Sequence, residues 1–211
     1  MKELDLLKKD WKKNENSFQQ VSENDIYKMI HKNSSSVVRL IMIIGIIEFL
    51  FWIGISLFSN NDEYFQKLNM DNILLYMRIL TYAHYAIIVT FIYLFYKNYI
   101  VISTTDSTKI LMKNILKTRR TVNIYVWYNL GMIIFSLILG FMLAYFYNPD
   151  FALVKEKIEH DGIKAILFFI GIVIAIVGVF TVISWLFYKL LYGFLMKKLY
   201  KNYEELKKID L

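Results

Sequence analysis

The fold is decided by the stretch 165–187, which reads AILFFIGIVIAIVGVFTVISWLF. It contains no charged residue, and its few polar side chains do not gather on one face at helical spacing. A helix needs about 20 apolar residues to cross about 30 Å of hydrocarbon at about 1.5 Å per residue. The stretch is long enough, so it predicts a membrane span rather than a helix of a hydrophobic soluble bundle.

Three more apolar blocks precede this one, and we predict four spans at 37–58, 73–96, 122–147 and 163–191. Inside a membrane the backbone must satisfy its own hydrogen bonds, so each block forms a helix. The composition agrees, because 57% of the 211 residues are hydrophobic and only 20% are charged. Soluble domains have roughly 45–50% apolar and about 25% charged residues. We therefore predict an all-α integral membrane protein with four transmembrane helices.

The basic residues predict how the chain is oriented. Seven lysines lie in the segment 1–36, and more Lys and Arg follow the second and fourth spans, whereas the other two loops hold few. Loops rich in Lys and Arg stay on the cytoplasmic side, so both termini are predicted to be cytoplasmic. The net charge of +7 is explained by this topology and by contact with anionic lipid. It does not indicate nucleic-acid binding.

The four spans form a bundle over 37–191. We also predict amphipathic cytoplasmic helices in the segment 1–36, in the middle loop between the second and third spans, and in the tail 192–211. Apolar residues share helical faces in the N-terminal segment, and these are the candidates for docking a partner: Leu4, Leu7, Trp11, Ile26 and Ile30. The middle loop carries a basic stripe that is expected to contact lipid headgroups: Lys109, Lys113, Lys117 and Arg120. Two interpretations stay open. The helices either lie on the membrane or pack against one another, or they dock a soluble partner.

Three polar residues inside the spans need a reason, because an ionisable group at membrane depth is costly. Glu48 lies ten residues from the outer end of the first span, and His84 eleven from that of the second. Counted from these ends, both lie roughly 15–16 Å deep, with Arg78 nearer the outer surface. The three form either a buried polar clamp between spans or a site that couples protons or ions.

Small residues recur at about every fourth position in the last two spans: Ser136, Gly140, Ala144, Gly171, Ala175 and Gly178. Such faces let helices approach closely, within one chain or between two copies in a homo-oligomer. Several tyrosines, among them Tyr125, Tyr128, Tyr188 and Tyr192, are expected at the inner membrane boundary, where their rings prefer to lie.

Catalytic motifs are missing from the sequence. There is no phosphate-binding glycine loop, dinucleotide fingerprint, serine elbow or HExxH zinc motif, and no cysteine. The three histidines, His31, His84 and His160, fall at different predicted depths and do not converge on one metal ion. We therefore predict neither enzyme activity nor a metal or other cofactor.

Three stretches carry a resemblance: LLKKDWKKNE at 6–15, SSSVVRLIMIIGIIEFLFW at 34–52 and STTDSTKILMKNILKTRRTVNIYVWYNL at 103–130. They resemble a family of small four-span inner-membrane proteins from flavobacteria and related bacteria. The resemblance implies a bacterial inner-membrane location, and a sigma-factor gene neighbourhood of some members implies a regulator of transcription factors. Some members carry the label β-carotene 15,15′-monooxygenase. Such enzymes hold iron with four histidines, and this chain has three, so its residues do not support that activity.

The leading prediction is a non-enzymatic membrane scaffold or regulator that docks a cytosolic protein. The alternative is a small transporter or channel subunit that uses Glu48, His84 and Arg78. A water-accessible cavity at Glu48 would favour transport, and a dry, paired Glu48 would favour the scaffold.

Overall fold

The computed structural model describes residues 22–58 and 71–209, and among them every long element is a helix. Four helices in it are long and apolar enough to cross a membrane, which confirms the predicted fold class. The elements are α2 (Glu23–Phe58), α4 (Asp71–Thr104), α5 (Thr108–Tyr147), the 3₁₀ turn η1 (Pro149–Phe151), α6 (Ala152–Asp161), α7 (Ile163–Tyr188), the π-helical segment η2 (Lys189–Gly193) and α8 (Phe194–Ile209).

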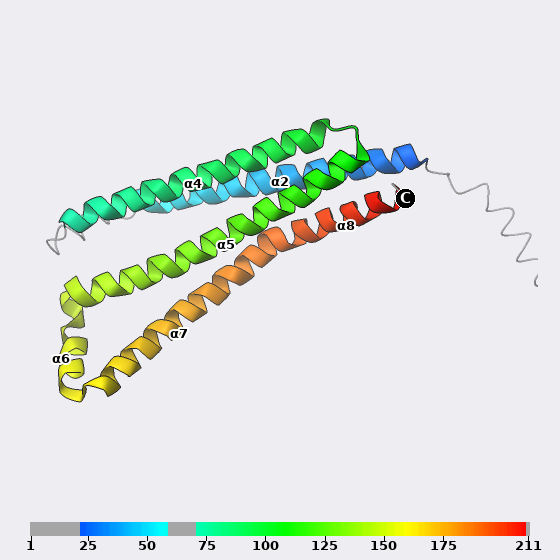
Figure 1. Ribbon diagram of the computed structural model, residues 1–211. Coiled ribbons are helices and arrows are strands. Elements are labelled where there is room, and N and C mark those ends of the chain that lie inside the picture. The colour runs from blue at the N-terminus through cyan, green and yellow to red at the C-terminus, as the bar shows by residue number, and fades with distance from the viewer. Residues whose placement is uncertain (1–21, 59–70, 210–211) are drawn as a thin grey trace, which may run out of the picture.

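The helices form an elongated bundle that is closed at one end and splayed at the other. α2 and α4 run side by side, α5 lies next to α4, and α7 diverges from them toward the short helix α6, which crosses the splayed end (Figure 1). α7, η2 and α8 follow one another without a break, and α8 packs against both α2 and α5. The closed end therefore contains parts of α2, α4, α5 and α8.

The four helices extend beyond the predicted spans at the closed end. Only residues 105–107 separate α4 from α5, where the sequence predicts a longer loop with a helix of its own. The reason is that the amphipathic stripes pack on one another and so keep the helices together. Buried apolar side chains from all four helices form this core: Ile30, Ile102, Leu111, Ile115, Leu195, Leu199 and Leu206.

Polar contacts tie the two ends of the chain together at the closed end. Asn202 of α8 donates a hydrogen bond to the buried Ser34 of α2 at 2.9 Å, and accepts one from Asn33 at 3.1 Å. On the α2–α4 side, His31 bonds the carbonyl of Ile102 at 2.7 Å. The beginning of α2 and the end of α8 thus lie at the same end of the bundle.

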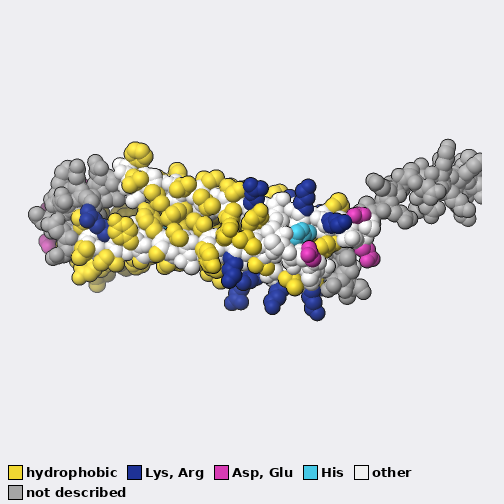
Figure 2. Space-filling model, turned by 90° about the horizontal axis from the view of Figure 1, so that it is seen from above, with side chains coloured by type: hydrophobic (Ala, Val, Ile, Leu, Met, Phe, Trp, Pro, Cys, Tyr) yellow, Lys and Arg dark blue, Asp and Glu magenta, His cyan; other side chains and the backbone are white. Residues whose placement is uncertain are grey.

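This closed end is also the basic end. We call the segments 23–36, 97–121 and 194–209 the basic bundle; together they hold thirteen Lys and Arg and five Asp and Glu. Figure 2 shows hydrophobic side chains over most of the molecule's length, with Lys and Arg gathered toward this end. The boundary between the two surfaces is where we place the edge of the hydrocarbon.

The splayed end turns sharply at two places. Asn148 caps η1 by accepting a hydrogen bond from the backbone N–H of Asp150 at 2.9 Å, with Pro149 at the first position of the turn. Gly162 joins α6 to α7 with φ +58° and ψ −133°, a conformation that residues with a Cβ rarely adopt. These residues set α7 on its diverging course.

The predicted small-residue faces do not bring helices together within the chain. Ser136, Gly140, Gly171, Ala175 and Gly178 are exposed, and Ala144 is half-buried. A Cβ added at Gly140, Gly171 or Gly178 would meet nothing within 4 Å. α5 and α7 do pack on each other, but these glycines are not where the two helices approach closely within the chain.

Candidate functional site

Glu48 of α2 lies at the centre of a cluster of tyrosines, which we call the tyrosine cage. Tyr125 of α5 donates to its Oε2 at 2.8 Å, Tyr192 donates to the same oxygen at 3.2 Å, and Tyr188 donates to Oε1 at 2.5 Å. Glu48 is buried, with 8% of its surface exposed. The two oxygens of one carboxyl group are thus held from α5, the end of α7 and η2.

The helices approach closely here for reasons that are visible in the sequence. Gly45 lies one turn before Glu48, and a Cβ at that position would be 3.4 Å from the ring of Phe95 and 3.9 Å from the hydroxyl of Tyr192. Tyr188 directly precedes η2, and Tyr192 lies within it. η2 is a π-helical turn, and such turns are frequent at functional sites. Their rings stack at 6.2 Å, and both hydroxyls reach the same carboxyl group.

Within the described part of the chain, the hydrogen bonds to this carboxyl group come from three neutral hydroxyls and not from a cation. An ionised carboxylate is an acceptor only, so three donors suit it, and bonds to a charged group are stronger than those between neutral groups. Burying a charge without partners would cost far more than the bundle could offset. Among the described residues, neither His84 nor Arg78 forms a hydrogen bond with Glu48.

His84 belongs to a second pair beside the cage. Its Nδ1 lies 3.0 Å from the hydroxyl of Tyr128, and the two rings stack at 5.6 Å. Tyr128 follows Tyr125 by three residues, so the His84 pair is offset from the cage by about 4.5 Å along α5. Counting residues from span ends predicts one level for Glu48 and His84, whereas their hydrogen-bond partners on α5 are three residues apart. Arg78 lies six residues nearer the start of α4 than His84, about 9 Å along the axis.

A cavity of about 490 Å³ lies on the splayed side of the cage. Side chains from α2, α4, α5 and α7 line it: Trp52, Ile55, Ser56, Met77, Leu80, Thr81, His84, Tyr85, Asn129, Met132, Ile133, Ser136, Leu137 and Tyr188. Glu48 does not line this cavity; Tyr188 stands between them. The carboxyl group is therefore enclosed, although polar groups next to it face an open space.

The basic bundle presents its charges outward. The predicted headgroup contacts Lys109, Lys113, Lys117 and Arg120 are all exposed on α5. Of the described residues in the basic bundle, only Lys201 and Glu205 form an ion pair, at 3.7 Å. Most of the positive charge is thus left for an external partner.

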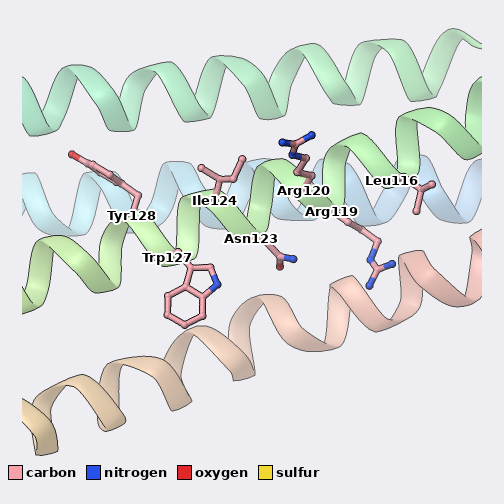
Figure 3. Close-up of a pocket in the computed structure, with 7 residues that line it drawn as sticks. All are labelled: Leu116, Arg119, Arg120, Asn123, Ile124, Trp127 and Tyr128. Atoms are coloured by element: carbon pink, nitrogen blue, oxygen red, sulfur yellow. The ribbon is translucent and has the colours of Figure 1, made fainter.

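A groove of about 680 Å³ follows α5 at the edge of the basic bundle. Figure 3 shows Arg119 and Arg120 on different sides of α5, with Arg119 directed toward the neighbouring helix. The guanidinium of Arg119 lies 4.5 Å from the ring centre of Tyr200 on α8, a cation–π contact. Trp127, further along the groove, is 70% exposed.

The docking candidates divide into two groups. Ile30 is buried in the chain's own core at 5% exposure, and Ile26 packs partly against that core. The stripe on α2 is therefore filled from within the chain. Leu4, Leu7 and Trp11 lie outside the described residues.

The histidines lie in three separate places, as the sequence predicts. His31 is in the basic bundle, His84 is beside the cage, and His160 is on α6, where it bonds Asp161 at 2.8 Å. Among the described residues, no three His, Cys, Asp or Glu side chains are grouped as ligands for a metal ion.

A family model matches residues 24–211, a range that includes the tyrosine cage, the cavity and all of the basic bundle except its first residue. The chain belongs to the family described as Domain of unknown function (DUF8845). No curated protein and no solved structure matches the chain. The match treats the membrane part and the basic bundle as one unit, in agreement with helices that run through both.

The sequence alone identifies Glu48 but not its partners. It places Tyr125, Tyr188 and Tyr192 at the membrane boundary as interfacial rings, whereas all three are buried. One available signal is that a buried tyrosine hydroxyl usually finds a partner. Tyr188 and Tyr192 are four residues apart and Glu48 is the one acidic side chain in the apolar blocks, so the pairing could have been proposed from these facts.

Proposed function

We propose that this chain is a non-enzymatic scaffold or regulator of a bacterial inner membrane, which docks a soluble cytosolic protein on its basic bundle. The observation that supports the proposal is the combination of a self-filled core with an unpaired basic surface. The basic bundle contains thirteen Lys and Arg but only five Asp and Glu. The apolar stripes of its helices pack against one another in the core. Recognition is then electrostatic, and the partner presents an acidic face.

The orientation follows from the same charges. The basic end is on the cytoplasmic side, because loops rich in Lys and Arg are retained there. The described N- and C-terminal helices lie together at this end, so both termini are cytoplasmic in this proposal. The splayed end, with α6, then faces the outer side of the membrane.

Contact with anionic lipid does not by itself explain how far the basic bundle extends from the membrane surface. Arg120 lies at the start of the apolar part of α5, and Lys113 and Lys109 stand about 10 and 16 Å beyond it along the helix. Lys201 stands about 18 Å beyond Lys189 in the same way. A headgroup layer is only about 5–8 Å thick. Arg120 and Lys117 are therefore suited to lipid phosphates, and the more distant lysines are suited to a protein.

The segment 1–21 supplies the remaining candidate contacts. Its apolar face, Leu4, Leu7 and Trp11, would give the partner an anchor next to the charged surface. The resemblance described above makes a sigma factor one candidate for the partner. The small-residue faces of α5 and α7, which are open in a single chain, are available for a second copy.

Transport through Glu48 has weaker support. Three hydroxyls donate to the two carboxyl oxygens, and Glu48 does not line the cavity next to the cage. A paired Glu48 that lines no open cavity was expected for a scaffold, and a Glu48 in a water-accessible cavity for a transporter. The enclosed carboxyl group therefore favours the scaffold.

The test is site-specific photocrosslinking in native membranes. A photoreactive residue at Lys109, at the tip of the basic bundle, is expected to capture one soluble protein. The double variant Lys113→Glu/Lys201→Glu reverses two exposed charges and is expected to abolish the capture. Lys157→Glu/Lys164→Glu makes the same charge change at the splayed end and serves as the matched control, which should leave the capture unchanged.

Deletion of residues 1–21 separates the two parts of the proposed surface. It leaves every contact described here in place, so the bundle should remain folded while the captured amount falls. If Lys109 captures no soluble protein above the level seen from Lys157, the docking function is wrong. If capture survives the charge reversal, recognition is not electrostatic.

A further inference from the structure

The cavity next to the tyrosine cage has the composition of a ligand site. Its volume of about 490 Å³ falls in the range of about 300–1,000 Å³ that small-molecule sites occupy. None of its fourteen lining residues is Asp, Glu, Lys or Arg. A charged molecule, including the phosphate head of a phospholipid, would find no counter-charge there.

Three of the polar side chains that line the cavity, Tyr188, His84 and Asn129, lie at the end that adjoins the cage. Tyr188 belongs to the cage itself, His84 is bonded to Tyr128, and Asn129 follows Tyr125 by one helical turn. Leu137 lies eight residues beyond Asn129 on α5, about 12 Å toward the splayed end. The cavity thus has Tyr188, His84 and Asn129 at its floor and a mainly apolar wall beyond them, which also carries the hydroxyls of Ser56, Thr81 and Ser136.

Hydrogen-bonding capacity remains at this floor. The Nδ1 of His84 is occupied by Tyr128, and within the described residues its Nε2 forms no hydrogen bond. The hydroxyl of Tyr188 donates to Glu48, and its oxygen can still accept. Each of these two lining residues therefore has one donor or acceptor left for a ligand.

The route to the cavity is through the membrane. α7 packs on α5 and α6 and diverges from α2 and α4 (Figure 1). Trp52 and Ile55, which line the cavity, are 49% and 41% exposed, so the cavity is open to the apolar surface of the spans. A molecule that enters this way is already dissolved in the bilayer.

We propose that the cavity binds a neutral, membrane-dissolved molecule with an apolar body and one oxygen head, a hydroxyl or carbonyl, which hydrogen-bonds His84 Nε2 and Tyr188. A pure hydrocarbon would leave both groups without a partner, and one hydrogen bond corresponds to about a tenfold change in affinity. The head is therefore what distinguishes this molecule from the acyl chains around it. The inference is independent of the docking function.

Fluorescence quenching tests the proposal, because Trp52 lines the cavity. The variant Trp11→Phe/Trp127→Phe/Trp185→Phe leaves Trp52 as the only tryptophan of the four. In lipid nanodiscs it is titrated with 6,7-dibromooctadecan-1-ol and, separately, with 6,7-dibromooctadecane. We expect saturable quenching by the alcohol, with half-saturation at a mole fraction about tenfold lower than for the alkane.

His84→Ala should remove the preference for the alcohol, because the head loses its partner. Thr90→Val, a change at an exposed position on α4 outside the cavity, is the control and should keep the preference. Ser136→Phe narrows the cavity and should weaken quenching by both probes, which keeps the test informative if His84→Ala does not fold.

Three results would overturn the proposal. Equal or unsaturable quenching by the alcohol and the alkane would mean that hydrocarbon merely fills the space. Saturable quenching by a phosphatidylcholine brominated at the same carbons would assign the cavity to bulk lipid. A preference for the alcohol that survives His84→Ala would place the head elsewhere.

Discussion

Removing one hydroxyl from the tyrosine cage should destabilise the bundle more than a typical hydrogen bond inside a membrane does. Tyr125→Phe deletes a 2.8 Å bond to Glu48 and changes nothing else in shape. Hydrogen bonds between membrane helices contribute about 0.6 kcal/mol on average and about 1.7 at most. Bonds to a charged group contribute about 1.5–3 kcal/mol, and we expect a loss in that range.

The distances also predict an order. Tyr188→Phe, at 2.5 Å, and Tyr125→Phe should cost the most, and Tyr192→Phe, at 3.2 Å, should cost the least. For a chain of this size the larger losses correspond to a fall in Tm of roughly 3–12 °C.

A double-mutant cycle isolates the charge. Glu48→Gln keeps the shape but leaves a neutral amide, whose nitrogen can no longer accept a hydrogen bond. In this background the cost of Tyr125→Phe should fall to about 0.5–1.5 kcal/mol, so the coupling free energy should be about 1 kcal/mol. Additive costs would mean that Tyr125 and Glu48 do not interact.

The assay is reversible unfolding of the purified protein in mild detergent, by SDS titration followed with circular dichroism. Tyr82→Phe is the matched control, because Tyr82 is 69% exposed on α4 and should lose nothing. If Tyr125→Phe and Tyr188→Phe unfold no more easily than Tyr82→Phe, the tyrosine cage does not hold the helices together.

Three further predictions concern the closed end, the splayed end and the exposed face of α7. Asn202→Leu removes the donor to the buried hydroxyl of Ser34 and should lower the free energy of unfolding by about 1–3 kcal/mol; an unchanged SDS midpoint would contradict the contact between α8 and α2. Gly162→Ala forces a side chain into a conformation with φ +58° and should cost about 1 kcal/mol in the same assay, whereas no loss would mean that the turn relaxes. Gly178→Ala meets open space and should raise stability by roughly 0.5–1 kcal/mol; a loss, together with a smaller particle in size-exclusion chromatography, would show instead that this face packs on a second copy.

The sequence predicts the spans well because their signal is local. Charge-free runs such as 165–187 need no knowledge of what they pack against, since lipid is their neighbour. The same locality explains why Glu48 stands out in the sequence as a residue that needs partners. Each of these predictions depends on one segment at a time.

What the sequence does not predict depends on contacts between distant segments. Residues 48 and 188 are 140 positions apart, and the pairing is determined by how α7 turns at η2 and approaches α2. The amphipathic stripes of α2, α5 and α8 look alike whether they lie on lipid, bind a partner or pack together. Only their mutual fit, with Leu111, Ile115 and Leu199 fully buried, decides among these.

The unbroken run from α7 through η2 to α8 has a mechanical consequence. It bends near η2 (Figure 1), and π-type turns are among the places where helices bend. The cage clamps the run at Tyr188 and Tyr192, so this point is a fulcrum, with arms of about 39 Å in α7 and about 24 Å in α8 at 1.5 Å per residue. If the run pivots as a rigid body, a sideways shift of the α6 end moves the tip of α8 by about three-fifths as much in the opposite direction. A movement of α6 at one face of the membrane would then move α8 at the other face, because α7, η2 and α8 form one continuous run.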